Sequence, residues 1–182
     1  MEKKKGPSPR IPLEEGSTLV VKRSDLKRVM VDYHNTLETG NTITNRNEEA
    51  MVKLLDAGYQ VCICSWCFKR RAKEVQATLN KYPWIDRVWK VMFTEKRIND
   101  PESKSSLCRV WAMKALFDDS RDILEDSLAK GVTCYPIKTA WEDHMWFKSH
   151  GFAVGPWATF ADAVEAFLKQ EAEEAKEIST AT

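Results

Sequence analysis

Short apolar runs alternate along the chain with segments in which apolar residues recur at helical spacing. The run Val29–Val31 is typical of a buried strand, whereas Ala50, Met51, Leu54 and Leu55 form one face of a helix. Strands and helices that alternate in this way indicate βαβ units, in which a helix connects two parallel strands. The predicted strands cover residues 27–32, 60–65, 87–93, 114–118 and 132–137. The expected fold class is α/β, a three-layer α/β/α domain with a mainly parallel central sheet.

The two ends of the chain depart from this alternation. Residues 1–16 are rich in Lys, contain Pro and offer little to bury, so we predict a disordered basic tail there. Residues 17–21 can form an outer strand. Near the other end, Thr159–Asp162 matches a capping box and begins a helix with an apolar side. We expect a single domain over residues 17–170, followed by an acidic tail over residues 171–182.

Composition limits the class of protein. The length of 182 residues and the hydrophobic content of 43% allow one sizeable core. The net charge of +1 is close to zero and does not indicate a particular charged binding partner. No apolar run reaches the roughly 18 residues that a membrane span needs, and the basic N-terminus lacks the apolar segment of a secretory signal. Five cysteines, an odd number, favour a reducing compartment over a disulfide framework. We expect a cytoplasmic protein without a membrane partner, and the nucleus stays open as a location.

Two local patterns suggest chemistry and also have structural explanations. Cys64–Cys67 spells C-x-x-C, but zinc needs four ligands, and Cys108 and Cys134 form no second pair. We expect these cysteines to act as small buried hydrophobes. The stretch from Trp66 to Arg97 contains nine Lys or Arg residues but only three Asp or Glu, and tryptophans lie between them. This stretch is compatible with a nucleic-acid substrate, while a solvated helix face and core packing explain it at least as well.

Residues of the types used in catalysis stand where the predicted strands end or the helices begin. Asp32 follows the first strand, and Ser65 ends the second. Lys104 precedes the helix that leads to the fourth strand, which ends at Asp118-Asp119. Ligands of parallel α/β sheets bind at the carboxyl ends of the strands. The order of these residues therefore predicts a functional site at that edge of the sheet.

This order of residues resembles the haloacid dehalogenase (HAD) superfamily of hydrolases. The first motif of that family is an apolar strand followed by D-x-D-x-T/V, and Asp32–Thr36 reads D-Y-H-N-T. The second motif, a strand ending in Ser or Thr, is matched by Ser65, and the acidic fourth motif by Asp118-Asp119. The third motif is a lysine, for which Lys104 is the best match and Lys96 the alternative. The resemblance spans residues 27–137 and implies a HAD-like Rossmannoid fold.

The resemblance also implies a magnesium-dependent phosphatase. Asp32 would be the nucleophile and would form an aspartyl-phosphate, a covalent intermediate that divides one difficult step into two. Mg²⁺, which prefers hard oxygen ligands, would bind Asp32, Asp119 and the backbone carbonyl of His34. The substrate phosphate would be held by Thr36, Ser65 and Lys104. Asp118 would orient Lys104 without contacting the substrate itself.

His34 occupies the position where phosphatases of the family carry a second Asp, the general acid and base. Neutral imidazole has one donor and one acceptor, so His34 can take over proton transfer. Two other readings stay open. The chain could catalyse another hydrolysis, because dehalogenases and phosphonatases of the family also replace this Asp, or it could be a catalytically attenuated HAD-like domain that binds a protein or ligand.

The segments between the motifs are short. Residues 38–46 leave room for a flap between the first strand and its helix, and the resemblance therefore implies a capless or minimal-cap member. An open site suits a bulky phosphorylated substrate, such as the end of a macromolecule. The oligomeric state is not indicated by the sequence.

Overall fold

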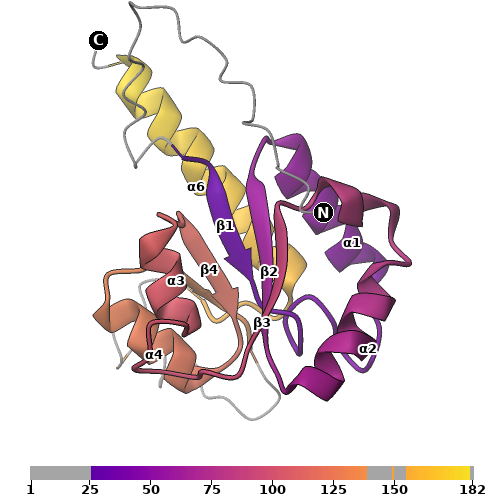
Figure 1. Cartoon of the computed structure of the whole chain (residues 1–182). Helices are drawn as coiled ribbons and strands as arrows, with labels where there is room; N and C mark the ends of the chain where they lie inside the picture. Colours follow the sequence, from indigo (N-terminus) through magenta and orange to yellow (C-terminus); the bar gives the residue numbers. More distant parts are fainter. Residues whose placement is uncertain (1–25, 139–148, 150–154, 181–182) are drawn as a thin grey trace, which may run out of the picture.

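The fold is that of a five-stranded, all-parallel sheet covered by helices on both faces (Figure 1). The computed structural model describes residues 26–138, 149 and 155–180. The strands follow the order β3-β2-β1-β4-β5 across the sheet. Their bounds are Arg28–Val31 (β1), Gln60–Trp66 (β2), Lys90–Thr94 (β3), Ala115–Asp118 (β4) and Cys134–Pro136 (β5). The basic tail and outer strand predicted for residues 1–21 lie outside the described residues.

Alternate residues of the central strands point to opposite faces of the sheet. Val29 and Val31 of β1 join one apolar cluster, whereas Met30 between them joins the other. The same alternation occurs in β2 and β4, because side chains of a strand repeat with a period of two. Both faces are therefore buried, which explains why the strands read as continuous apolar runs in the sequence.

Two layers of helices cover these faces. α1, α2 and α6 contribute to the cluster that contains Val29, and α3 and α4 to the cluster that contains Met30 (Figure 1). The bounds of these helices are Asn45–Asp56 (α1), Lys69–Leu79 (α2), Lys104–Val110 (α3), Arg121–Ala129 (α4) and Phe160–Thr180 (α6). A short 3-10 helix, η2, covers Pro83–Arg87. The predicted three-layer α/β/α fold is thus confirmed.

The chain changes direction across the sheet at β1. β2 and β3 extend the sheet to one side of β1, and β4 and β5 extend it to the other. The connection after β1 therefore runs toward β2, and the connection after β4 runs toward β5, in the opposite direction. A crevice between two such connections, at the carboxyl ends of the strands, is the usual ligand site of these sheets.

Some boundaries differ from the sequence prediction. β3 begins at Lys90 rather than at residue 87, because Pro83 starts a 3-10 helix that continues to Arg87. At the C-terminal end, α6 continues to Thr180, although the sequence predicts an acidic tail from residue 171. Glu is a good helix former, and Glu171 also accepts hydrogen bonds from Tyr59 and Lys114, both at 2.8 Å.

Candidate active site

Asp32 lies directly beyond β1, in the middle of the sheet edge. Its backbone N–H donates to the carbonyl of Phe117 at 2.9 Å, which continues the pairing of β1 with β4. The chain then turns back through Asn35, whose φ of 57° lies in the left-handed region that Asn tolerates well. The N–H of Leu37 closes the turn on the carbonyl of Asp32 at 3.3 Å. This local geometry holds the carboxyl group of Asp32 in a buried position, 5% exposed.

Lys104, the first residue of α3, is buried between two of the carboxylates. Its Nζ contacts Oδ1 of Asp32 and donates to Oδ2 of Asp118 at 2.7 Å. The competing lysine, Lys96, has a half-exposed side chain whose Nζ lies 3.9 Å from Asp100. The structure therefore brings Lys104, and not Lys96, to Asp32.

Three carboxylates meet at this point. Oxygen atoms of Asp32, Asp118 and Asp119 all lie within 4.8 Å of one another, and all three residues are buried. Asp118 already accepts from Lys104 with one oxygen and from the backbone N–H of Ser120, at 2.9 Å, with the other. This leaves Asp32 and Asp119 to face a cation. Hard carboxylate oxygens in a tight group fit Mg²⁺, which prefers oxygen ligands and keeps several waters.

The electrostatics of the group favour a bound cation. Burial raises the pKa of the Asp32 carboxyl despite the opposing effect of Lys104, and burial together with Asp32 raises the pKa of Asp119. Burial alone would lower the pKa of Lys104, but Asp118 and Asp32 outweigh it and raise that pKa, so the ammonium stays charged. One buried ammonium faces three buried carboxylates, and the remaining negative charge must be balanced by protons or by a metal ion.

His34 and Ser65 form a pair beside the carboxylates. Ser65, in β2, is fully buried, and its Oγ lies 3.1 Å from Nδ1 of His34. Burial lowers the pKa of His34 below its ordinary value, so the imidazole is neutral near pH 7. Both residues are predicted from the sequence as site residues, but their contact is not, because they are 31 positions apart and meet only when β2 pairs with β1.

Thr36 and Asn47 anchor the loop that follows Asp32. Thr36 is 1% exposed, and its Oγ1 has no hydrogen-bond partner among the described residues. The side-chain amide of Asn47 donates to the carbonyls of Thr36 and Leu37 at 3.4 and 3.0 Å, and its Oδ1 accepts from the N–H of Ala161 at 3.2 Å. Asn47 was not selected from the sequence; its only signal is a polar residue among apolar ones on the inward face of α1.

The pocket at Asp32 is lined by aromatic and basic side chains as well as by the residues described above. It encloses about 420 Å³ and is lined by Asp32, His34 and Lys104 together with Trp66, Phe68, Arg71 and Arg97. Phe68 is 67% exposed, which is unusual for a large apolar side chain. The guanidinium of Arg97 lies 4.6 Å from the ring centre of Trp66. The sequence does not single out these four residues as site residues, although the stretch that contains them has an excess of basic charge.

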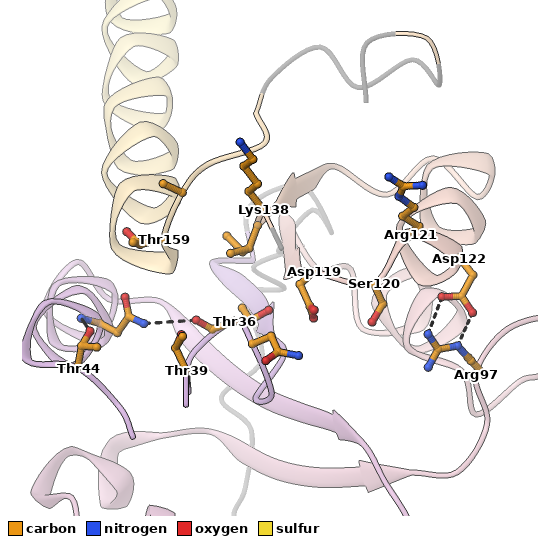
Figure 2. A pocket seen from close by; sticks show the side chains of 14 residues that line it. Thr36, Thr39, Thr44, Arg97, Asp119, Ser120, Arg121, Asp122, Lys138 and Thr159 are labelled. Atoms are coloured by element: carbon orange, nitrogen blue, oxygen red, sulfur yellow. Dashed lines mark hydrogen bonds and ion pairs between the residues drawn. The ribbon is translucent and has the colours of Figure 1, made fainter. Parts of the chain in front are cut away.

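Figure 2 shows the residues that line a second, larger cavity of about 970 Å³, which adjoins the first. The two share Asn35, Arg97, Asp119 and Ser120 as lining residues. Thr36, Arg121 and Lys138 are among the residues that line only the larger one. Sequence reasoning did not detect this cavity, because its walls come from segments between residues 35 and 159.

The five cysteines and Trp84, which suggested other chemistry, are buried. All five cysteines are free and buried, as expected, and burial raises the pKa of Cys62 to about 12. Cys67 lines the smaller pocket, and burial raises the pKa of its thiol as well. Trp84 is only 4% exposed and stacks on Tyr82 with ring centres 5.3 Å apart. Its burial favours core packing over contact with nucleic-acid bases.

Comparisons with known proteins identify the fold. No protein-family model and no curated protein matches the sequence. Among solved structures, the chain is similar to D,D-heptose 1,7-bisphosphate phosphatase from B. bronchiseptica, complexed with magnesium and phosphate. The TM-score is 0.53 at 13% identity, over 80% of this chain and 99% of that one.

The chain is also similar to a protein from Thermotoga maritima assigned as a β-phosphoglucomutase, with a TM-score of 0.53 at 13% identity. That match covers 69% of this chain, and the chain spans only 60% of the length of the Thermotoga maritima protein. At this level of identity the similarity establishes the HAD-like Rossmannoid α/β fold. In the part of the chain that the structure describes, no helix combines the length and apolar character required to cross a membrane.

Proposed function

We propose that the chain is a magnesium-dependent, HAD-type phosphohydrolase that acts through an aspartyl-phosphate on Asp32. The observation that carries this proposal is the buried group of three carboxylates and one ammonium at the carboxyl ends of β1 and β4. A stable core gains little from such a group, because burying unpaired charge is costly. A bound divalent cation removes that cost and supplies charge that attracts the phosphate of a substrate.

The residues around Asp32 have distinct roles in this proposal. A carboxylate oxygen of Asp32 attacks phosphorus, the bond from phosphorus to the leaving oxygen breaks, and the leaving oxygen takes a proton. Water then attacks the same phosphorus, and Asp32 is released with inorganic phosphate. Lys104 and Ser65 hold phosphoryl oxygens while charge shifts between them, and Asp118 keeps Lys104 in place through its 2.7 Å hydrogen bond.

The proton transfers are assigned to His34. Its Nδ1 lies at hydrogen-bond distance from Ser65, so the other ring nitrogen is the one available to the leaving group and to the attacking water. Nδ1 donates to Ser65 in both steps. In the imidazolium form the second nitrogen gives its proton to the leaving oxygen, and the neutral ring that results accepts a proton from the attacking water. The ring thus returns to its starting state without a second aspartate.

An open entrance supports a substrate with a large leaving group. Between β1 and α3 the chain forms only α1, β2, α2, η2, β3 and short connections, so the segment carries no inserted cap domain. The flap after Leu37 is a small hairpin, in which Thr39 and Thr42 exchange backbone hydrogen bonds of 2.8 and 3.3 Å. In this proposal the bulk of the substrate lies at the surface and only its phosphate reaches Asp32.

Hydrolysis of 4-nitrophenyl phosphate tests the proposal. The wild type is expected to release phosphate only when Mg²⁺ is present, and Asp32→Asn is expected to lower the rate by at least about a thousandfold, because the neutral amide cannot attack phosphorus. Asp86→Asn, an exposed change on η2, is the matched control and should retain activity.

Two results would contradict the proposal. Activity that survives in Asp32→Asn would exclude this residue as the nucleophile. No Mg²⁺-dependent hydrolysis and no rise in the melting temperature with Mg²⁺ would instead support the alternative of a binding module, because a ligand of the native state must raise that temperature.

A further inference from the structure

The pocket at Asp32 changes in character between its floor and its mouth. The groups at the floor are buried and charged: Asp32 is 5% exposed and Lys104 is 1% exposed. Two aromatic side chains line the mouth, Trp66 at the end of β2 and Phe68 just before α2. Trp66 is half-buried, and Phe68 is 67% exposed. When a phosphate group reaches Asp32, the rest of its molecule therefore lies beside these two rings.

Phe68 contributes little to the core or to its helix. Its ring is part of neither apolar cluster of the described residues. It precedes the first turn of α2, where Ser, Thr, Asp or Asn usually caps a helix, and its own side chain has no oxygen for this role. A carboxylate oxygen of Glu95 instead accepts from the N–H of Lys69 at 3.3 Å. A large, exposed apolar side chain at a cap position departs from the rules that stabilise a fold, and such departures are expected at functional sites.

Trp66 is held in one orientation. Its Nε1 donates to the carbonyl of Glu95 at 3.2 Å, and the guanidinium of Arg97 lies 4.6 Å from its ring centre. Arg97 is itself bound to Asp122 by two hydrogen bonds, one of them 2.8 Å long. The ring centres of Trp66 and Phe68 are 6.0 Å apart, with their planes at 55°. The mouth thus has an aromatic surface that is ordered before a substrate binds, which lowers the entropic cost of binding.

The two arginines of the mouth do not favour a second anionic group over an aromatic one. Arg71 contacts Glu74 at 3.0 Å, and Arg97 is bound to Asp122. Each guanidinium thus has an acidic partner that offsets its charge. The aromatic surface of Trp66 and Phe68 is therefore the feature of the mouth that best distinguishes one leaving group from another.

We propose that Trp66 and Phe68 bind the leaving group of the substrate, and that this leaving group carries a planar aromatic ring, either an aryl group or a nucleobase. This inference rests on the proposed function and specifies its substrate class. The pocket of about 420 Å³ has the size of small-molecule sites. With the phosphate at Asp32, the ring of the leaving group packs against Phe68 in the tilted or offset arrangement that aromatic pairs prefer.

Matched substrate pairs test the proposal by comparing a leaving group with and without an aromatic ring. Benzyl phosphate is compared with cyclohexylmethyl phosphate; in both, the leaving oxygen is bonded to a methylene group, so both need a general acid to a similar degree. Adenosine 5′-monophosphate is compared with ribose 5-phosphate, so that the two pairs distinguish an aryl group from a nucleobase. The wild type is expected to show a kcat/KM about three- to tenfold higher for the aromatic member of at least one pair.

Variants of Phe68 separate ring contact from apolar contact. Phe68→Leu keeps an apolar side chain but removes the ring, and is expected to reduce the preference to less than about twofold, mainly through KM. Phe68→Tyr keeps the ring and should keep the preference. The control is Ile178→Ala, which shortens an exposed apolar side chain of α6 outside both pockets and should change nothing. A wild type without preference in both pairs, or a preference that survives in Phe68→Leu, would overturn the inference, while Asp32-dependent hydrolysis of 4-nitrophenyl phosphate would still support the proposed function.

Binding to the inactive variant gives a readout that does not depend on turnover. The four compounds are titrated calorimetrically into Asp32→Asn with Mg²⁺, and again after Phe68→Leu is added. Tighter binding of the aromatic member of a pair, by about three- to tenfold and lost with Phe68→Leu, supports the aromatic site even when no substrate is hydrolysed and the proposed function has failed. Equal affinities within both pairs, or no binding of any of the four compounds, would overturn the inference.

Discussion

At the scale of single residues, the site differs from the D-x-D pattern at His34, and the structure provides a physical reason why imidazole can serve there. Its Nδ1 is 3.1 Å from Ser65, and burial lowers its pKa, so the ring stays neutral and retains one donor and one acceptor. A carboxylate in the same half-buried place would add a negative charge to those of Asp32, Asp118 and Asp119. The neutral ring adds no charge that a metal ion would have to offset in the proposed mechanism.

The role of His34 predicts a dependence on the leaving group. His34→Ala is expected to lower the hydrolysis of an alkyl phosphate by about a hundredfold or more, because an alkoxide needs a proton from a general acid. Hydrolysis of 4-nitrophenyl phosphate should fall much less, since its phenolate leaves readily without one. Steady-state kinetics on both substrates measure the difference, and equal losses would rule out the role of acid.

At the scale of elements, the loop after Asp32 depends on one side chain from a helix. Asn47 of α1 donates to the carbonyl of Leu37 at 3.0 Å and accepts from the N–H of Ala161 at the start of α6 at 3.2 Å. It therefore joins α1, the loop after Asp32 and α6 at the edge of the larger cavity. Helical periodicity predicts that α1 exists and which face it buries, but not that a buried amide on this face connects two distant backbones.

Replacing this amide should loosen the site. Asn47→Ala is expected to lower the free energy of unfolding by about 2–4 kcal/mol, because it removes the partner of the buried carbonyl of Leu37 and of the half-buried N–H of Ala161. Urea unfolding followed by circular dichroism measures the change. Asn45→Ala, an exposed residue of the same helix, is the control and should stay within about 0.5 kcal/mol of the wild type. A change of that small size in Asn47→Ala would contradict the proposed connection.

At the scale of the whole molecule, the buried carboxylates connect stability to pH and to metal. In the metal-free protein, burial raises the pKa of Asp119 to about 8, above the value of about 3.9 in an unfolded chain. The native state therefore holds a proton that the unfolded state has released. Its contribution to stability is fully present below about pH 4 and is lost as the pH rises through 8. Mg²⁺ needs the ionised carboxylate and thus competes with this proton.

The rise in melting temperature caused by Mg²⁺ should therefore be larger at about pH 8.5 than at about pH 6. Thermal unfolding with and without excess Mg²⁺ at both values measures it. Asp119→Asn should reduce the difference between the two pH values but not abolish it, because burial also raises the pKa of Asp32 to about 7. A rise that is the same at both values in the wild type would show that proton and metal do not share this group.

The sequence by itself determined the strands, the class of fold and the charged residues that meet Asp32, namely Lys104, Asp118 and Asp119. These features are local: a strand reads as an apolar run because both its faces are buried, and polar residues such as Ser65 interrupt that run where it reaches the edge of the sheet. Helix ends are less well determined, as α6 shows, because an acidic segment suits both a helix and a tail.

Only the tertiary structure decided which residues meet. It selects Lys104 over Lys96, because α3 directs Lys104 between Asp32 and Asp118 while Lys96 stays half-exposed. It also pairs His34 with Ser65 and brings Trp66 and Phe68 to the pocket at Asp32. These contacts join segments far apart in the chain, and their geometry is set by the order of strands in the sheet, which no local pattern of residues encodes.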